Sequence, residues 1–154
     1  MASRIELLRT VRIFKDLEDG ELARVAECCR EERFESGAYI FREGEAGNRL
    51  YLVIEGEVRI SRVIPGSGEE ALAVLKPGAL FGEMAVFDRS ERSTDAISNG
   101  GTRCLTISRA DFELLLDLNR EIAFKVLWGI VRLQAMRLRQ ANDSLRTFLA
   151  MSMF

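Results

Sequence analysis

Residues 81–96 include a glycine, an acidic residue and an arginine, at a spacing that would let the folded segment bind an anion. The segment reads FGEMAVFDRSERSTDA. A glycine followed by a short helix leaves backbone amides free at the helix start, where a phosphate can bind. Arg92 follows Gly82 after about ten residues, so its guanidinium fork can fold back over the same phosphate, and Ser93 adds a hydroxyl donor. Glu83, in the first turn, is an acceptor suited to a ribose hydroxyl.

The same residues have a plainer interpretation. In this interpretation Gly82 is a turn residue with no further role, and Glu83 and Arg92 form an ion pair at the surface. Short motifs of this kind also arise by chance. The three residues taken alone therefore leave both interpretations open.

The composition excludes much catalytic chemistry. The 154 residues include no histidine, which removes histidine bases, serine–histidine–aspartate triads and histidine-ligated metals. Cys28 and Cys29 are adjacent and Cys104 stands alone, so no CxxC pair is available for zinc or redox work. We interpret the cysteines as small buried hydrophobes. We therefore expect neither an enzyme nor a bound metal or cofactor.

Short strands and frequent glycines predict the scaffold around this segment. Helical spacing over residues 3–12 and 19–31 gives way to short runs rich in aromatic and β-branched residues. Glycines mark the corners between these runs, at Gly37, Gly44, Gly47, Gly56, Gly66, Gly68 and Gly78. Strands resume over 92–98 and 103–108, and we expect a hairpin turn at Asn99-Gly100-Gly101 between them. The fold class predicted is mainly β: an antiparallel, jelly-roll-like β-roll with N-terminal helices, one short helix and a long C-terminal helix.

The C-terminal part has a helical pattern from Ser108 to about Leu149, with a break near 117–119. We expect two units, 1–118 for the roll with its helices and 119–154 for the long helix and a short tail. Apolar residues of the long helix follow a heptad seam, which reads Phe124, Leu127, Val131, Gln134, Leu138, Ala141, Leu145 and Phe148. A second apolar stripe occurs only in its first half, at Ile122, Val126, Ile130 and Leu133. The pattern predicts that the helix packs on its own roll and that residues 124–148 form a homodimer.

Charge and hydropathy limit the partners. No apolar run is long enough to span a bilayer, and the N-terminus does not resemble a signal peptide. We expect a cytoplasmic protein without a membrane partner. Residues 120–154 carry six basic and two acidic side chains, whereas the rest of the chain is acidic. An acidic body argues against direct nucleic-acid binding.

Several glycine-anchored motifs occur in one order. They are Gly37-x-x-Ile40-Phe41-x-x-Gly44, Tyr51-x-x-x-x-Gly56-x-Val58, Pro77-Gly78-x-x-Phe81-Gly82-Glu83 and Arg92-Ser93-Thr94. Together they resemble the cyclic nucleotide-binding domain family, which includes the catabolite activator protein and the regulatory subunits of cyclic-nucleotide-dependent kinases. The resemblance covers about residues 8–149, and its phosphate-binding cassette corresponds to residues 81–94.

The resemblance implies a role for each cassette residue. Gly82 would let the backbone close on the cyclic phosphate, and Arg92 would pair with that phosphate. Glu83 would bind the ribose 2′-hydroxyl. Ser93 and the backbone amides around Met84 and Ala85 would complete the phosphate site, with Phe81 and Thr94 beside it. A polar residue of the long helix would contact the base: Asn142 is our candidate, with Arg137 and Arg139 as rivals.

The function implied is a regulatory module that binds cAMP, or with less support cGMP, and relays occupancy through its C-terminal helix to a partner protein. We expect no helix-turn-helix domain after that helix, because about five residues follow its apolar seam in the 154-residue sequence. One alternative is a dimeric scaffold that keeps the fold but binds no nucleotide. Another is the effector-binding fragment of a longer transcription regulator.

Overall fold

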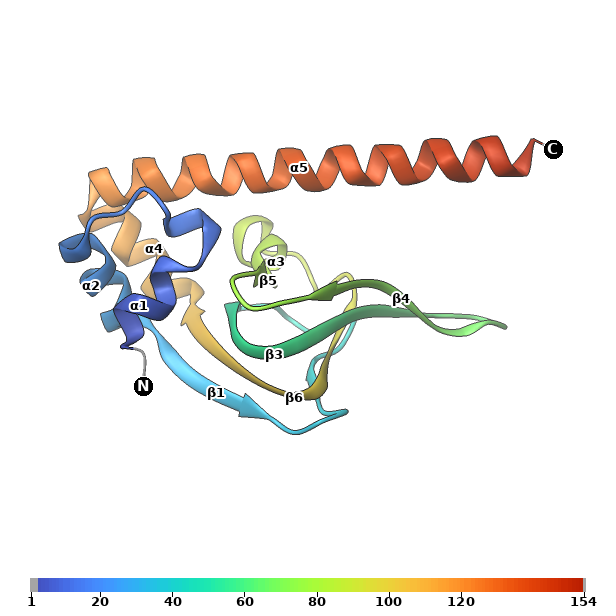
Figure 1. The fold of residues 1–154 in the computed structure, drawn as a ribbon, viewed down its shortest axis with the longest axis horizontal. Coiled ribbons are helices and arrows are strands. Elements are labelled where there is room, and N and C mark those ends of the chain that lie inside the picture. The colour runs from blue at the N-terminus through green and yellow to red at the C-terminus, as the bar shows by residue number, and fades with distance from the viewer. Residues whose placement is uncertain (1–2, 154) are drawn as a thin grey trace.

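A computed structural model describes residues 3–153, with a β-sheet, helices at one end of it and a long helix along one side (Figure 1). The mainly β fold with flanking helices that the sequence predicts is confirmed. The elements in chain order are α1 (Arg4–Arg9), the 3-10 helix η1 (Arg12–Phe14), α2 (Asp19–Cys28), β1 (Arg30–Phe34), β2 (Tyr39–Phe41), β3 (Arg49–Ile64), β4 (Gly68–Leu75), β5 (Leu80–Phe81), α3 (Glu83–Asp88), β6 (Asp95–Ser108), α4 (Arg109–Leu118) and α5 (Arg120–Ser152).

Two long strands, β3 and β6, form the centre of the sheet. The described strands make a six-stranded antiparallel sheet in the order β1-β6-β3-β4, with β2 paired to β6 and β5 paired to β3. β5 pairs with β3 at Tyr51 and Leu52, and the first residue of β6, Asp95, pairs with Ser61 of β3. The segment 82–94 between β5 and β6 is therefore held at both ends by the same strand.

The prediction of a hairpin turn at Asn99-Gly100-Gly101 is wrong. β6 is one strand that passes through these residues, and it pairs with β3 on both sides of them. Gly100 and Gly101 have φ values of 82° and 88°. A Cβ on Gly56 of β3 would lie 2.1 Å from the carbonyl oxygen of Gly101. The glycines thus allow two irregular strands to approach closely, instead of reversing the chain.

The buried apolar residues form two clusters. The larger lies where the helices pack on the sheet and includes Leu8, Phe14 and Val126. The smaller consists of Phe41, Tyr51, Val53, Val58, Phe81, Ala96 and Cys104. Three rings of the smaller cluster, on Phe41, Tyr51 and Phe81, have centroids 5.0 to 6.1 Å apart. Burial raises the pKa of the Cys104 thiol to about 12, which fits the interpretation of this cysteine as an unreactive core residue.

The C-terminal pattern forms two helices, and the break predicted near 117–119 is confirmed at Asn119, between α4 and α5. The second stripe of α5 is buried against the body of the protein, at Ile122, Val126 and Ile130. Gly129 allows a close crossing of η1, because a Cβ there would lie 2.8 Å from the carbonyl oxygen of Ile13. The apolar seam residues are exposed instead, among them Phe124, Leu127, Val131, Leu138, Leu145 and Phe148.

None of the helices within residues 3–153 has the length and apolar content that crossing a bilayer requires. Within the same residues, histidine, cysteine and acidic side chains do not gather in groups of three or more that could hold a metal ion.

Candidate functional site

The chain between β5 and β6 turns sharply into a single short helix. Gly82 precedes α3 in the left-handed conformation, with a φ of 76°. Glycine adopts this conformation without a steric penalty, whereas other residues are strained there. A Cβ at Gly82 would also lie 2.8 Å from a guanidinium nitrogen of Arg92. Gly82 is therefore required both by the turn and by the arginine packed against it.

Arg92 is the central cation of the site. Its residue is only 6% exposed, and its guanidinium donates to the carbonyl oxygens of Gly82 at 2.7 Å and Arg49 at 2.8 Å. The guanidinium carbon also lies 4.2 Å from the centroid of the Phe41 ring. Burial lowers the pKa of Arg92 from its ordinary value.

No carboxylate within the described part of the chain forms an ion pair with Arg92. A buried charge without a counter-ion is costly, and such charges are normally paired. The two carbonyl oxygens fix the position of the guanidinium but leave its positive charge without an anion. Two neutral carbonyl groups therefore position the guanidinium, and the carboxylates of Glu45 and Glu83 act on its charge without forming an ion pair with it.

Glu83 is buried as deeply, at 2% exposure. Its carboxylate accepts a hydrogen bond from the side-chain amide of Gln134 at 2.9 Å and forms an ion pair with Arg137. Arg137 also donates to the carbonyl oxygen of Leu80 at 2.5 Å. Two side chains of α5 thus bind the carboxylate of Glu83, the first residue of α3.

Arg109, the first residue of α4, joins α3 to the chain at Gly47 through hydrogen bonds. Its guanidinium donates to the carbonyl oxygens of Gly47 at 2.5 Å, Ala85 at 2.9 Å and Val86 at 3.3 Å. It satisfies carbonyl groups of α3 that have no partner within so short a helix. The role of Arg109 is not predictable from the sequence, because nothing in the local pattern around residue 109 relates it to residues 47 and 85.

These elements enclose a cavity of about 360 Å³. Eight of the residues expected at the site line it: Phe81, Gly82, Glu83, Met84, Ala85, Arg92, Ser93 and Thr94. Apolar side chains from three strands form further walls, at Phe41, Ile60, Ala73 and Leu75. The cavity therefore has a polar end at α3 and Arg92 and an apolar end formed by the strands.

The long helix contributes Arg137 and Gln140 to this cavity. Residues three apart on a helix share a face, and Asn142 lies beyond that face. Asn142 is exposed and does not line the cavity of its own chain, and Arg139 does not line it either. The role of Asn142 as a base contact stays a prediction, whereas its rival Arg137 does line the cavity.

Comparisons with known proteins identify the family of this chain. The family model described as "Cyclic nucleotide-binding domain" matches residues 31–119. A Mycobacterium tuberculosis protein named "CRP-like cAMP-activated global transcriptional regulator" is 31% identical over 140 residues, which cover 91% of this chain and 61% of that protein. The Drosophila melanogaster "cGMP-dependent protein kinase, isozyme 1" is 33% identical over 145 residues, covering 92% of this chain and 19% of the kinase.

Among solved structures, the catabolite activator protein of Thermus thermophilus superposes with a TM-score of 0.79 at 34% identity, over 89% of this chain and 62% of that one. The chain thus spans less than two thirds of the length of these relatives. The family model covers more than half of the chain and includes the whole cassette. The resemblance seen in the glycine motifs is confirmed: this chain belongs to the cyclic nucleotide-binding domain family.

Proposed function

We propose that the cavity of about 360 Å³ binds a cyclic nucleotide as a regulatory signal, with cAMP preferred to cGMP, and that no reaction is catalysed there. The observation that carries this proposal is Arg92, a buried guanidinium that lacks a carboxylate partner among residues 3–153. A singly charged cyclic phosphate supplies the missing anion. The cAMP-activated regulator of Mycobacterium tuberculosis supports the preference for cAMP.

The lining residues suggest how the ligand lies. In the proposed complex the cyclic phosphate faces Arg92, the Ser93 hydroxyl and the first amides of α3, including those of Met84 and Ala85. The ribose 2′-hydroxyl donates to Glu83. The base then lies along the apolar walls, within reach of Gln140.

The link between Glu83 and α5 suggests how occupancy is relayed. A ribose hydroxyl that donates to Glu83 joins a carboxylate already bound by Gln134 and Arg137. The nucleotide therefore changes the contacts that hold α5 to α3, and it can shift α5 only by binding its two positions with different affinity. We propose that a partner protein in the cytoplasm detects this shift.

The exposed seam of α5 supports a homodimer through residues 124–148. Its apolar residues repeat along the helix and stand in solvent in a single chain. Contiguous apolar patches of this kind usually mark an interface. A second helix packed along the seam would cover them.

The same seam also favours a second candidate function, a dimeric scaffold that binds no nucleotide. The two candidates differ at Arg92, because a scaffold has no need of an unpaired buried guanidinium. A third arrangement, in which this chain is the effector-binding part of a longer transcription regulator, keeps the same site. The reading frame beyond residue 154 distinguishes that arrangement.

Calorimetric titration of cAMP and cGMP into the wild type, Arg92→Ala and Arg33→Ala tests the proposal. We expect cAMP to bind the wild type and to bind Arg92→Ala about a hundredfold more weakly, because the phosphate loses its buried partner. Arg33 is an exposed arginine of β1 outside the cavity, so Arg33→Ala should bind as the wild type does. Absence of binding heat with both nucleotides would favour the scaffold.

A further inference from the structure

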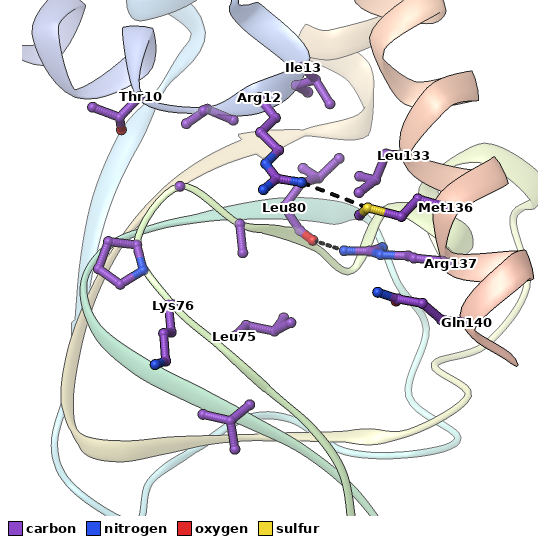
Figure 2. Close-up of a pocket in the computed structure, with 15 residues that line it drawn as sticks. Thr10, Arg12, Ile13, Leu75, Lys76, Leu80, Leu133, Met136, Arg137 and Gln140 are labelled. Atoms are coloured by element: carbon purple, nitrogen blue, oxygen red, sulfur yellow. Dashed lines mark hydrogen bonds between the residues drawn. The ribbon is translucent and has the colours of Figure 1, made fainter. Parts of the chain in front are cut away.

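A second cavity lies next to the nucleotide cavity and is not used by the proposed function. Its volume is about 330 Å³, and its walls are η1, the segment between β4 and β5, and the middle of α5 (Figure 2). The two cavities share Leu75, Arg137 and Gln140. Arg137 therefore lines both cavities.

All the ionisable residues that line the second cavity are basic. They are Arg12 from η1, Lys76 from the β4–β5 segment and Arg137 from α5, and none of the 15 lining residues is acidic. In a chain with a net charge of −2, such a set does not follow from the overall composition. The cavity is therefore locally cationic on an acidic protein.

Two of these cations have no acidic partner. Within residues 3–153, neither Arg12 nor Lys76 forms an ion pair. Arg12 extends across the cavity toward α5, where its guanidinium lies 3.7 Å from the sulfur of Met136 (Figure 2). A thioether is a weak acceptor, so this contact orients the guanidinium without neutralising it.

The rest of the lining is mostly apolar. On the helical side the lining residues are Ile13, Leu133 and Met136. Leu75, the last residue of β4, and Pro77, in the segment between β4 and β5, add further apolar lining. A ligand that fits both features carries a negative charge on an apolar body. A cyclic nucleotide fits poorly, because this cavity lacks the left-handed glycine and short helix that form the phosphate end of the other one.

We propose that this second cavity binds a small organic anion, a carboxylate carried on an aromatic or branched aliphatic body. The carboxylate binds the Arg12 guanidinium, Lys76 adds positive charge to the lining, and the apolar body packs against Leu133 and Met136. The site is separate from the nucleotide cavity, and its occupancy does not require Arg92. The protein would thus respond to two ligands of different chemistry.

The probe for this site is phenylacetate, with the neutral phenylacetamide as its matched analogue. In amide-resolved NMR titrations of the full chain, phenylacetate up to about 10 mM should give saturable shifts in η1, residues 76–79 and residues 133–137. Phenylacetamide should bind about tenfold more weakly, because it lacks the charge. Equal binding of the two compounds, shifts confined to the exposed seam, or no saturable shift would overturn the proposal.

Charge-reversal variants test the residues. The pair Arg12→Glu with Lys76→Glu should weaken phenylacetate about tenfold or more. The control pair Lys15→Glu with Arg33→Glu makes the same change of charge at exposed positions outside the cavity and should bind as the wild type does. Equal weakening in both pairs would show only general attraction and overturn the site. If the cavity pair folds poorly, Arg12→Gln should still weaken the probe, and wild-type affinity in that variant would also count against the site.

The two proposals fail separately. Arg92→Ala should lose cAMP and keep phenylacetate, whereas the cavity pair should lose phenylacetate and keep cAMP. Loss of both ligands in both variants would mean that the cavities are not distinct, and would overturn the second site. A chain that never binds cyclic nucleotide but binds phenylacetate as described would refute only the proposed function.

Discussion

Glu83, at the start of α3, and Arg137, in the middle of α5, form an ion pair across 54 residues of sequence. The Glu83 carboxylate is buried, and the Arg137 side chain is 31% exposed. This pair joins the cassette to the long helix and lines the cavity of about 360 Å³. It gives a direct physical connection between the expected ribose contact and the expected output helix.

Replacing Arg137 by alanine should destabilise the protein by about 2 kcal/mol, because a buried carboxylate loses its charged partner. The value is set below that of a fully buried pair, since part of Arg137 is in solvent. Urea unfolding measures the change. Arg139→Ala, at an exposed position two residues away, should change the unfolding free energy little. In the double variant with Glu83→Gln much of the loss should be recovered; a simple sum of the two losses would argue against this coupling.

Replacing Gly82 by alanine should cost about 1 to 2 kcal/mol and weaken cAMP binding. The new Cβ is strained at a φ of 76° and lies 2.8 Å from the Arg92 guanidinium. Gly20→Ala is the matched control, because Gly20 lies in α2 and a Cβ there meets nothing within 4 Å. Alanine is the better helix former, so Gly20→Ala should stabilise slightly in the same urea titration. The same sign for both variants would contradict the argument.

The Glu21 carboxylate of α2 should make the free energy of unfolding depend on pH. The backbone amide of Glu18 and, next, the Lys125 ammonium hold the pKa of Glu21 below its ordinary value. A lowered folded-state pKa stabilises the protein above the unfolded value of about 4.3, and this stabilisation is lost as the pH falls through the folded value. Glu21→Gln should therefore lower the unfolding free energy at pH 7, and its difference from the wild type should shrink below about pH 4.

Glu27→Gln provides the comparison for this pH series. Glu27 is exposed on the same helix, so its substitution should leave the unfolding free energy nearly unchanged at pH 7 and at pH 3. A wild-type advantage over Glu21→Gln that persists undiminished at pH 3 would mean that the carboxylate charge is not its source.

The seam of α5 should control the oligomeric state. Leu138 is 62% exposed and Leu145 is 54% exposed in the single chain. Replacing both by glutamate puts like charges on each face of a helix pair, so a wild-type dimer should become a monomer in light scattering. Leu118→Glu makes the same kind of change at an exposed residue of α4, outside residues 124–148, and should leave the dimer intact. A monomeric wild type, with and without cAMP, would remove the homodimer.

The sequence alone determined the local features. The spacing of apolar residues predicted two faces for α5, and the structure has one buried and one exposed. Glycines and β-branched runs predicted an antiparallel roll. These features could be predicted because each depends on backbone preference or periodicity within a few residues. The cassette, in contrast, was assigned only through the resemblance of the glycine-anchored motifs to a known family.

Only the tertiary structure decided which distant groups meet. Asn99-Gly100-Gly101 has the local signal of a turn, but pairing with β3 on both sides keeps it inside one strand. The burial of Arg92 against Arg49, the support from Arg109 and the presence of Arg137 in place of Asn142 at the cavity all depend on contacts between separate elements. Such contacts are set by strand register and helix packing over the whole chain, and local sequence patterns carry no record of them.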